Sequence, residues 1–422
     1  MLSPKEPEIE IMSPAGSFES LASAIQAGAG SVYFGIEKLN MRSKSSINFT
    51  IDDLAEITRI CKENKVKTYL TVNTIIYDED IDTMKKIIDA ALINDITAVI
   101  ASDIATIQYC RSCNVNVHAS TQLNISNIEA LKFYARYCDV IVLARELNLN
   151  QVKKIHDRII IEKITGPGGK PVRIEMFIHG ALCMAVSGKC YLSLHEMNHS
   201  ANRGQCLQTC RKAYIVREKE SENEIEVDNE YIMSPKDLKT IHFLNKILDS
   251  GATVLKIEGR ARSPEYVKTV TKCYREAVDS ILESTYSEDK INNWNTKLEK
   301  VFNRGFWDGY YLGQKLGEWS NRYGSFATKR KVYIAKTTNY FSNLNVGEFL
   351  IETGSLDVGD EVLIIGTTTG VVETVVKEIR VDMKSVNHVK KGERCSIPIE
   401  TLIRRSDKLY KLIDAEKSIS IE

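Results

Sequence analysis

Four cysteines lie close together in the middle of the chain and are its strongest candidates for chemistry. Cys183, Cys190, Cys206 and Cys210 follow the spacing C-x6-C-x15-C-x3-C within a polar stretch. Thiolates bind soft metals, so the pattern is compatible with a tetrahedral zinc ion or with an iron–sulfur cluster held by four cysteines. Structural zinc sites usually use tight cysteine pairs, and the wide first gap therefore favours a cluster over zinc, with four metal-free thiols as the third alternative.

The other cysteines are scattered, which is typical of small buried residues rather than ligands. The N-terminus shows no basic region followed by an apolar run, so we expect a cytoplasmic protein whose thiols stay reduced and form no disulfide framework. The scattered residues are Cys61, Cys110, Cys113, Cys138, Cys273 and Cys395.

A second metal-binding pattern, HEMNH at residues 195–199, matches the zinc-peptidase motif H-E-x-x-H. That motif works on a helix, where His195 and His199 would share a face and Glu196 would activate a metal-bound water. The residues that follow, Ser200 to Gly204, form a poor helix without an apolar stripe. We therefore interpret the match as coincidental.

The overall composition is that of a soluble globular protein. Basic and acidic residues both number 56, so the bulk charge does not indicate a nucleic-acid partner, although a local basic surface is compatible with it. No stretch approaches 18 apolar residues, which predicts no membrane span. The chain also lacks G-x-S-x-G, G-x-G-x-x-G and Walker sequences.

Eight short β-rich runs, most followed by a helical pattern, predict the fold of the first 285 residues. Their near-continuous apolar character is typical of parallel strands buried on both faces, and eight such units predict a (β/α)8 TIM-like barrel. The runs are 8–17, 31–35, 67–73, 98–103, 117–122, 140–146, 173–180 and 254–260.

The active site of such a barrel lies at the carboxyl ends of its strands. Among the residues there, Arg145, Glu146, His179, Lys256 and Glu258 are the candidate catalytic side chains. Arg145, Lys256, Arg260 and Arg262 could instead bind phosphates or carboxylates. The remaining residues at strand ends are Ser13, Gly16, Tyr33, Asn73, Asp103 and Gln122.

The cysteines fall in a long insertion, at about 181–245, between the seventh and eighth strands. The insertion also contains a charged segment, 216–231, that we expect to be an exposed excursion or hairpin. We predict a connecting helical segment at 286–329 and a small C-terminal all-β barrel at 330–410. A helix is expected after the eighth strand, with Ser263 as N-cap and Pro264 as its first residue.

The insertion should place all four cysteines at the carboxyl mouth of the barrel. Cys183 and Cys190 follow directly from the seventh strand, and the short gap between Cys206 and Cys210 predicts one face of a helical turn. Ligands of one compact cluster would bring the four sulfurs within roughly 7 Å of one another. Gly188 and Gly204 should relieve the backbone as it wraps the centre.

The stretch EMFIHGALCMAVSGKCYLS at 175–193 resembles the signature of the collagenase-like peptidase family U32. The stretches SPAGSFESLASAIQAGAGSVYFG, SANRGQCLQTCR, LKIEGRARSPEYV and FNRGFWDGYYLG are also similar to that family. The resemblance covers about residues 8–405 and includes a C-terminal domain similar to domain two of translation elongation factors.

Family members imply an RNA-modifying function despite the peptidase name. The resemblance implies prephenate-dependent 5-hydroxylation of the wobble uridine of tRNA, with a 4Fe-4S cluster on the four cysteines and prephenate as co-substrate; zinc stays the alternative metal. Other members act on a ribosomal RNA cytidine or on a quinone precursor. An electron-transfer or cluster-assembly protein is a compatible partner. The alternatives are a peptidase and a non-catalytic RNA-binding adaptor that uses the aromatic residues of NRGFWDGYY.

Overall fold

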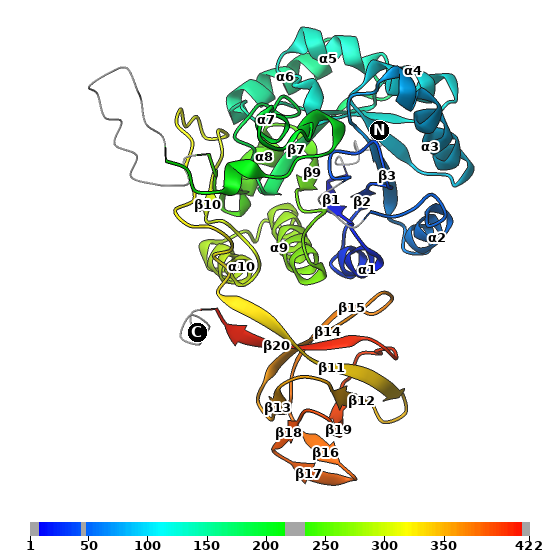
Figure 1. Cartoon of the computed structure of the whole chain (residues 1–422). Coiled ribbons are helices and arrows are strands. Elements are labelled where there is room, and N and C mark those ends of the chain that lie inside the picture. The colour runs from blue at the N-terminus through cyan, green and yellow to red at the C-terminus, as the bar shows by residue number, and fades with distance from the viewer. Residues whose placement is uncertain (1–7, 44–47, 216–232, 416–422) are drawn as a thin grey trace, which may run out of the picture.

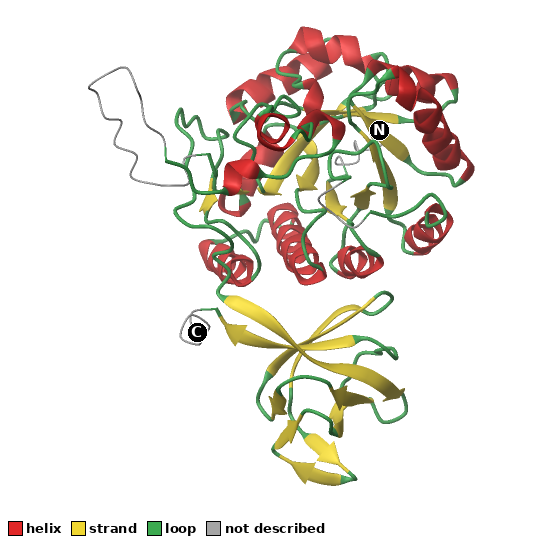
Figure 2. Ribbon diagram, viewed as in Figure 1, coloured by secondary structure: helices red, strands yellow, loops and turns green. Residues whose placement is uncertain are grey.

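The computed structural model describes residues 8–43, 48–215 and 233–415, which form an α/β barrel followed by an antiparallel β-domain (Figures 1 and 2). The charged segment 216–231, expected as an excursion, lies outside the described residues. Among the helices of the described part, none is long and apolar enough to cross a membrane.

Eight parallel strands close the barrel, which confirms the predicted fold class. Each strand pairs with the next along the chain, β7 pairs with β9, and β9 pairs with β1 to complete the ring. Seven of the runs predicted from the sequence contain one of these strands, and the eighth, 254–260, overlaps β9, which begins two residues earlier. The strands are β1 (Glu10–Pro14), β2 (Ser31–Phe34), β3 (Lys67–Val72), β4 (Ala98–Ala101), β5 (Val117–Ala119), β6 (Val140–Val142), β7 (Arg173–Gly180) and β9 (Ala252–Ile257).

Helices cover the outside of the ring (Figure 2). Side-chain caps fix several of their starts, as where Asn148 accepts a hydrogen bond from the backbone N–H of Gln151. The helix after β9 begins at Pro264 behind Ser263, as predicted, although the Ser263 side chain makes no capping hydrogen bond. These helices are α1 (Phe18–Gln26), α2 (Leu54–Glu63), α3 (Ile81–Ile93), α4 (Ile104–Ser112), α5 (Ile128–Ala135), α6 (Leu149–Ile161), α8 (Leu244–Asp249) and α9 (Pro264–Leu282).

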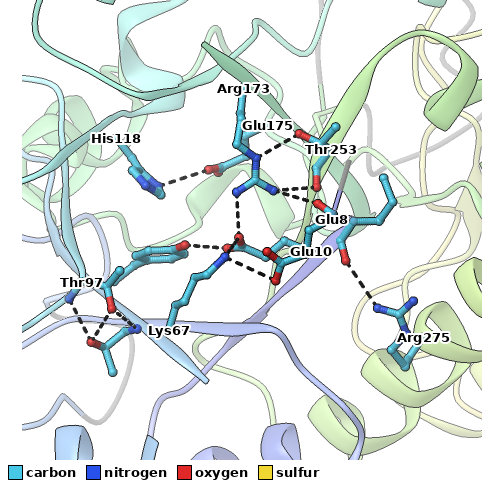
Figure 3. A network of polar contacts seen from close by, with 12 residues as sticks. Glu8, Glu10, Lys67, Thr97, His118, Arg173, Glu175, Thr253 and Arg275 are labelled. Atoms are coloured by element: carbon cyan, nitrogen blue, oxygen red, sulfur yellow. Dashed lines mark hydrogen bonds and ion pairs between the residues drawn. The ribbon is translucent and has the colours of Figure 1, made fainter. Parts of the chain in front are cut away.

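The amino end of the barrel interior is closed by a polar network (Figure 3). The buried carboxylate of Glu10 accepts hydrogen bonds from Tyr69 at 2.6 Å, Lys67 at 2.9 Å and Arg173 at 3.0 Å. Burial alone would raise the pKa of Glu10, but Lys67 and Arg173 lower it to about 2. This end of the barrel is therefore held by an ionised carboxylate with three donors.

Two short strands extend the sheet beside β7, one from the long insertion and one from the connecting segment after α10. β8 (Asp237–Lys239) pairs antiparallel with the end of β7, and β10 (Phe306–Trp307) pairs with β8. The insertion also carries a short helix, α7 (Leu192–Met197). Of the predicted connecting helical segment, only α10 (Glu288–Lys300) is an α-helix, and the remainder up to β11 is mostly turns and loops.

The C-terminal domain is built from antiparallel strands around its own apolar core, in agreement with the expected all-β module. It packs against α1 and α9 (Figure 1), where Gln26 and Lys268 donate to the carbonyls of Thr369 and Val371. The strands are β11 (Lys329–Phe341), β12 (Val346–Ile351), β13 (Ser355–Asp357), β14 (Glu361–Gly366), β15 (Gly370–Val375), β16 (Ile379–Val381), β17 (Lys384–Val386), β18 (His388–Lys390), β19 (Arg394–Pro398) and β20 (Lys408–Asp414).

Candidate functional site

The cysteine-bearing loops fold over the carboxyl ends of the barrel strands. They form hydrogen bonds with the loops that follow β2, β3, β5 and β6. The insertion therefore contacts the loops after four of the eight barrel strands. The contacts join Ser43 Oγ to Gly204 O at 3.0 Å, Ile75 N to Asn202 O at 3.1 Å, Asn124 Nδ2 to Ser187 O at 3.3 Å, and Arg145 Nη1 to Ala181 O at 3.0 Å.

Two glycines allow these loops to approach the barrel, as predicted. Gly188 and Gly204 have φ values of +76° and +79°, which side chains rarely adopt. A Cβ on Gly204 would lie 2.1 Å from the carbonyl oxygen of Asn40, and one on Gly188 would lie 2.7 Å from Cγ of Gln122. The backbone therefore wraps the mouth at a distance that only glycine permits.

The four cysteines of the insertion are close enough for the charges of three of them to change the pKa of the fourth, Cys210. Burial raises the pKa of the Cys210 thiol to about 11, Arg211 opposes the rise, and Cys183, Cys206 and Cys190 each add to it. Cys183 is exposed, and the other three are half-buried. The charges of the other three cysteines thus act on Cys210, and the 7 Å limit between the four sulfurs stays a prediction.

The predicted helical turn through Cys206 and Cys210 is wrong. Gln208 adopts a left-handed backbone with φ of 56°, and a separate 3-10 turn spans residues 209–211. This reversal separates the two cysteines into different segments. The fold of the loop, rather than helical periodicity, therefore sets the relative positions of Cys206 and Cys210.

Arginines beside the thiols would compensate the charge of a thiolate centre. The charges of Cys183 and Cys206 help to raise the pKa of Arg42, although burial opposes the rise and Glu258 contributes more. Arg211 is buried, and donates to the carbonyls of Leu182 and Pro235, both at 2.6 Å. The donor set of four soft thiols with adjacent guanidinium groups therefore suits an anionic iron–sulfur centre.

A zinc ion and an iron–sulfur cluster place different demands on the separation of four thiols. A tetrahedral zinc ion with bonds of about 2.3 Å requires its sulfurs within about 4 Å of one another. Within the described residues, no three His, Cys, Asp or Glu side chains are drawn together to hold a metal ion. The ligands of a cluster stand further apart, and a cluster on these four cysteines stays a prediction.

A half-buried carboxylate, Glu258, lies at the mouth itself beside three arginines. Glu258 Oε1 lies 2.9 Å from Nη2 of Arg42, and Tyr33 donates to Oε2 at 3.3 Å. Burial would raise the pKa of Glu258, but Arg42, Arg145 and Arg260 lower it to about 2. Glu258 is therefore ionised at neutral pH, and the three guanidinium groups leave the region with excess positive charge.

Deeper in the barrel, Lys256 pairs with Glu175. Its Nζ lies 2.7 Å from Oε1 of Glu175, and 4.6 Å from the ring centre of Tyr33. Oε2 of Glu175 and Nδ1 of His118 have no hydrogen-bond partner among the described residues and lie 3.9 Å apart. Burial raises the pKa of Glu175 and lowers that of His118 to about 3. Lys256 thus lies beneath the mouth, linked to it through Tyr33.

Two candidate catalytic residues lie apart from this cluster. His179 is buried against α9, where its Nδ1 is 3.3 Å from the hydroxyl of Tyr274, and burial lowers its pKa to about 3. It packs between β7 and the helix layer rather than opening onto the mouth. Glu146 is exposed and lines a cleft with Arg145 and Cys183. Of the candidate catalytic residues, Arg145 and Glu258 therefore lie at the mouth and Lys256 lies beneath it. Glu146 lines only the neighbouring cleft, and His179 does not reach the mouth.

Comparison with known proteins identifies the family. The model of Peptidase family U32 matches residues 16–321, which is most of the chain. The chain belongs to peptidase family U32. It is 59% identical to a "Collagenase" of Porphyromonas gingivalis, over 97% of this chain and 99% of the relative. It is 32% identical to "tRNA hydroxylation protein P1" of Bacillus subtilis, over 90% and 89% of the two chains. It is also 32% identical to the "23S rRNA 5-hydroxycytidine C2501 synthase" of Escherichia coli, over 74% of this chain and 46% of the relative.

The zinc-peptidase pattern is not assembled in this U32 protein. His195 lies near the end of α7, which stops where Asn198 turns to a left-handed backbone with φ of 55°. His199 follows that turn, and its Nδ1 lies 3.1 Å from Oε1 of Gln205. Residues 192–197 are helical, but the helix ends too early to align the two histidines, and residues 201–203 form only a 3-10 turn, in line with the poor helix expected at 200–204.

Three residues of the site escaped the sequence analysis. Arg42 and Asn40 follow β2 at a distance, and Arg211 directly follows Cys210. Asn40 Oδ1 accepts from Arg260 at 3.0 Å, which positions that buried guanidinium. Only their positions in the sequence could have pointed to these residues. Arg42 and Asn40 lie in a loop after a barrel strand, and Arg211 adjoins a candidate ligand.

Proposed function

We propose that this U32 protein hydroxylates C5 of the wobble uridine of tRNA, with prephenate as co-substrate and a 4Fe-4S cluster held by Cys183, Cys190, Cys206 and Cys210. The observation that carries the proposal is the packing of the cysteine loops onto a cationic barrel mouth. Relatives named as tRNA hydroxylation protein and as rRNA 5-hydroxycytidine synthase support a nucleobase substrate.

The residues of the mouth suit an anionic, planar substrate. An unpaired anticodon base can leave its stack at low cost and enter a barrel pocket. Arg145 and Arg42 would meet phosphate or prephenate carboxylates, because guanidinium groups pair bidentately with both. Arg145 stacks on Phe177 at 3.7 Å, and its Nε has no hydrogen-bond partner among the described residues. That guanidinium is therefore still able to donate to a substrate.

The remaining groups have distinct roles in this proposal. Replacing C5–H by C5–OH adds one oxygen atom to the base and removes two electrons from it, so the reaction requires an oxygen donor and a two-electron acceptor. A bound cluster would supply one-electron transfer between the base and that acceptor. Glu258 stays ionised because its pKa is about 2, so it accepts hydrogen bonds rather than donating a proton. Tyr33 donates to Glu258 and contacts Lys256, which joins the mouth to the buried pair below.

Nucleoside mass spectrometry tests this function. The full chain would be expressed in a bacterial strain that lacks its own tRNA hydroxylation proteins, with and without a prephenate supply. We expect 5-hydroxyuridine in tRNA only when both are present. Its absence under both conditions, with the protein folded and loaded with iron, would contradict the proposal.

A peptidase is the second candidate, because the relative at 59% identity is named a collagenase. This function would use His195, Glu196 and His199 with zinc, or a cysteine nucleophile. Gelatin degradation by the purified protein with added zinc tests it, with Glu196→Ala as the matched variant. Activity that is lost in Glu196→Ala would support a peptidase, and the same residual activity in both proteins would exclude the motif.

A further inference from the structure

Three cations and two aromatic rings form a half-buried cluster beside the barrel mouth. We define the cationic cluster as Lys239, Arg262, Arg304, Phe302 and Phe306. Lys239 ends β8, Arg262 follows β9 just before α9, and the other three belong to the loop and strand that lead through β10. All five side chains are partly accessible.

Aromatic contacts hold the cations of this cluster in place. The guanidinium carbon of Arg262 lies 3.6 Å from the ring centre of Phe302, and that of Arg304 lies 5.1 Å from the same ring. Nζ of Lys239 lies 4.7 Å from the ring centre of Phe306. Cation–π contacts fix the direction of a cation but leave its N–H donors unused.

Within the described part of the chain, two of these cations are not paired with a carboxylate. Among the described residues, the side chains of Lys239 and Arg262 form no hydrogen bond and no ion pair. Asp237 lies 3.6 Å from Nη1 of Arg304, whereas Glu299 and Asp308 act on Lys239 only through their charge and oppose the lowering of its pKa by burial. The N–H donors of Lys239 and Arg262 are therefore available to a ligand.

The cluster is continuous with the candidate site. Arg262 is close enough to Arg42 and Arg304 for their charges to lower its pKa, although burial is the larger cause. Arg304 donates to Oε1 of Gln208 at 3.3 Å, in the loop between Cys206 and Cys210. Positive charge therefore extends from the Glu258 region at the mouth to the cysteine loops.

We propose that the cationic cluster binds the backbone phosphates of RNA nucleotides that flank the base in the barrel mouth. This inference rests on the proposed function and names the surface that holds its substrate. Proteins that bind single-stranded nucleic acid combine a cationic groove with aromatic side chains, as this cluster does. A base inserted in the mouth brings its neighbouring phosphates to the rim where Arg262 lies.

Fluorescence anisotropy with a labelled anticodon stem-loop RNA tests the proposal on the full chain. We expect Lys239→Gln and Arg262→Gln each to weaken binding about 3- to 10-fold and to reduce the salt dependence by about one phosphate contact. Lys239→Arg should retain binding because it keeps the charge. Lys86→Gln, an exposed lysine on α3, is the matched control and should bind like the unmodified protein.

The outcomes separate this surface from the catalytic function. Unchanged affinity and salt dependence in a folded variant that carries both Lys239→Gln and Arg262→Gln would overturn the proposal, while hydroxylation is judged independently by mass spectrometry. If the variants keep their RNA affinity but have a raised KM for prephenate, the cationic cluster binds prephenate rather than RNA phosphates. That result would also overturn the proposal. Weaker RNA binding in the variants supports it even if the modified position differs.

Discussion

Nη2 of Arg42 lies 2.9 Å from Oε1 of Glu258, and this pair joins two loops at the carboxyl mouth of the barrel. The side chains are 20% and 15% exposed, so the pair is only partly screened by water. Arg42 is also the guanidinium whose pKa responds to Cys183 and Cys206. The pair therefore connects the barrel mouth to the cysteine loops.

Arg42→Gln should lower hydroxylation at least 10-fold and change its pH profile. Burial raises the pKa of Glu258 and Arg42 is the largest opposing cause, so the pKa rises above about 2 when Arg42 is removed. Glu258 then takes up a proton as the pH falls, and activity should decline on the acid side in the variant alone. Single-turnover rates from pH 5 to 8 measure this, and Arg42→Lys should restore part of the profile. If the rates of Arg42→Gln and of the unmodified protein depend on pH in the same way, Arg42 does not keep Glu258 ionised.

Cys190→Ser should lose iron while the barrel stays folded. Three remaining thiolates hold a four-iron cluster poorly, and the barrel core does not depend on the insertion. Protein purified without oxygen should lose its absorption near 400 nm and most of its iron, with circular dichroism unchanged. Cys113→Ser is the matched control, because Cys113 is half-buried at the end of α4, away from the insertion. Equal iron in the two variants would argue against the cluster.

Gly204→Ala should release the cysteine loops from the barrel. Its Cβ would lie 2.1 Å from the carbonyl oxygen of Asn40, so the loop must shift. We expect faster amide hydrogen exchange across residues 199–206 and reduced iron retention. Gly169→Ala has a similar φ of +72° with nothing within 4 Å of the new Cβ, so it shows only the backbone strain of about 1 kcal/mol. If residues 199–206 exchange their amide hydrogens at the same rate in Gly204→Ala and Gly169→Ala, the loop does not depend on the close contact between Gly204 and Asn40.

Glu10→Gln should remove part of the acid sensitivity of the barrel. The pKa of Glu10 is about 2 in the folded chain against an ordinary value of 4.5, so its stabilisation is present above pH 4.5 and is lost as the pH falls towards 2. Between pH 5 and pH 3 the unmodified protein should lose about 2 kcal/mol that the variant does not. Urea unfolding at both pH values, followed by tryptophan fluorescence, measures the difference. The same loss in both proteins would show that Glu10 is not the responsible group.

Strand and helix periodicity determined the barrel from the sequence alone. Eight apolar runs separated by helical patterns leave few arrangements, because parallel strands must be covered on both faces and crossovers are right-handed. The left-handed glycines at 188 and 204 were also predictable, since both lie where a polar loop must turn sharply. The candidate ligands were visible because four cysteines in one polar insertion are rare.

Only the tertiary structure decided which of the strand-end residues share a site. Lys256 and Glu258 reach the barrel interior and mouth, whereas the bulge near the end of β7 accompanies the packing of His179 against α9. Arg42 and Arg211 were invisible as site residues because loops place them, and loop conformation depends on long-range contacts rather than on local periodicity. The pairing of Arg42 with Glu258, 216 residues apart, exists only because barrel closure brings β9 beside β1 and the loop after β2.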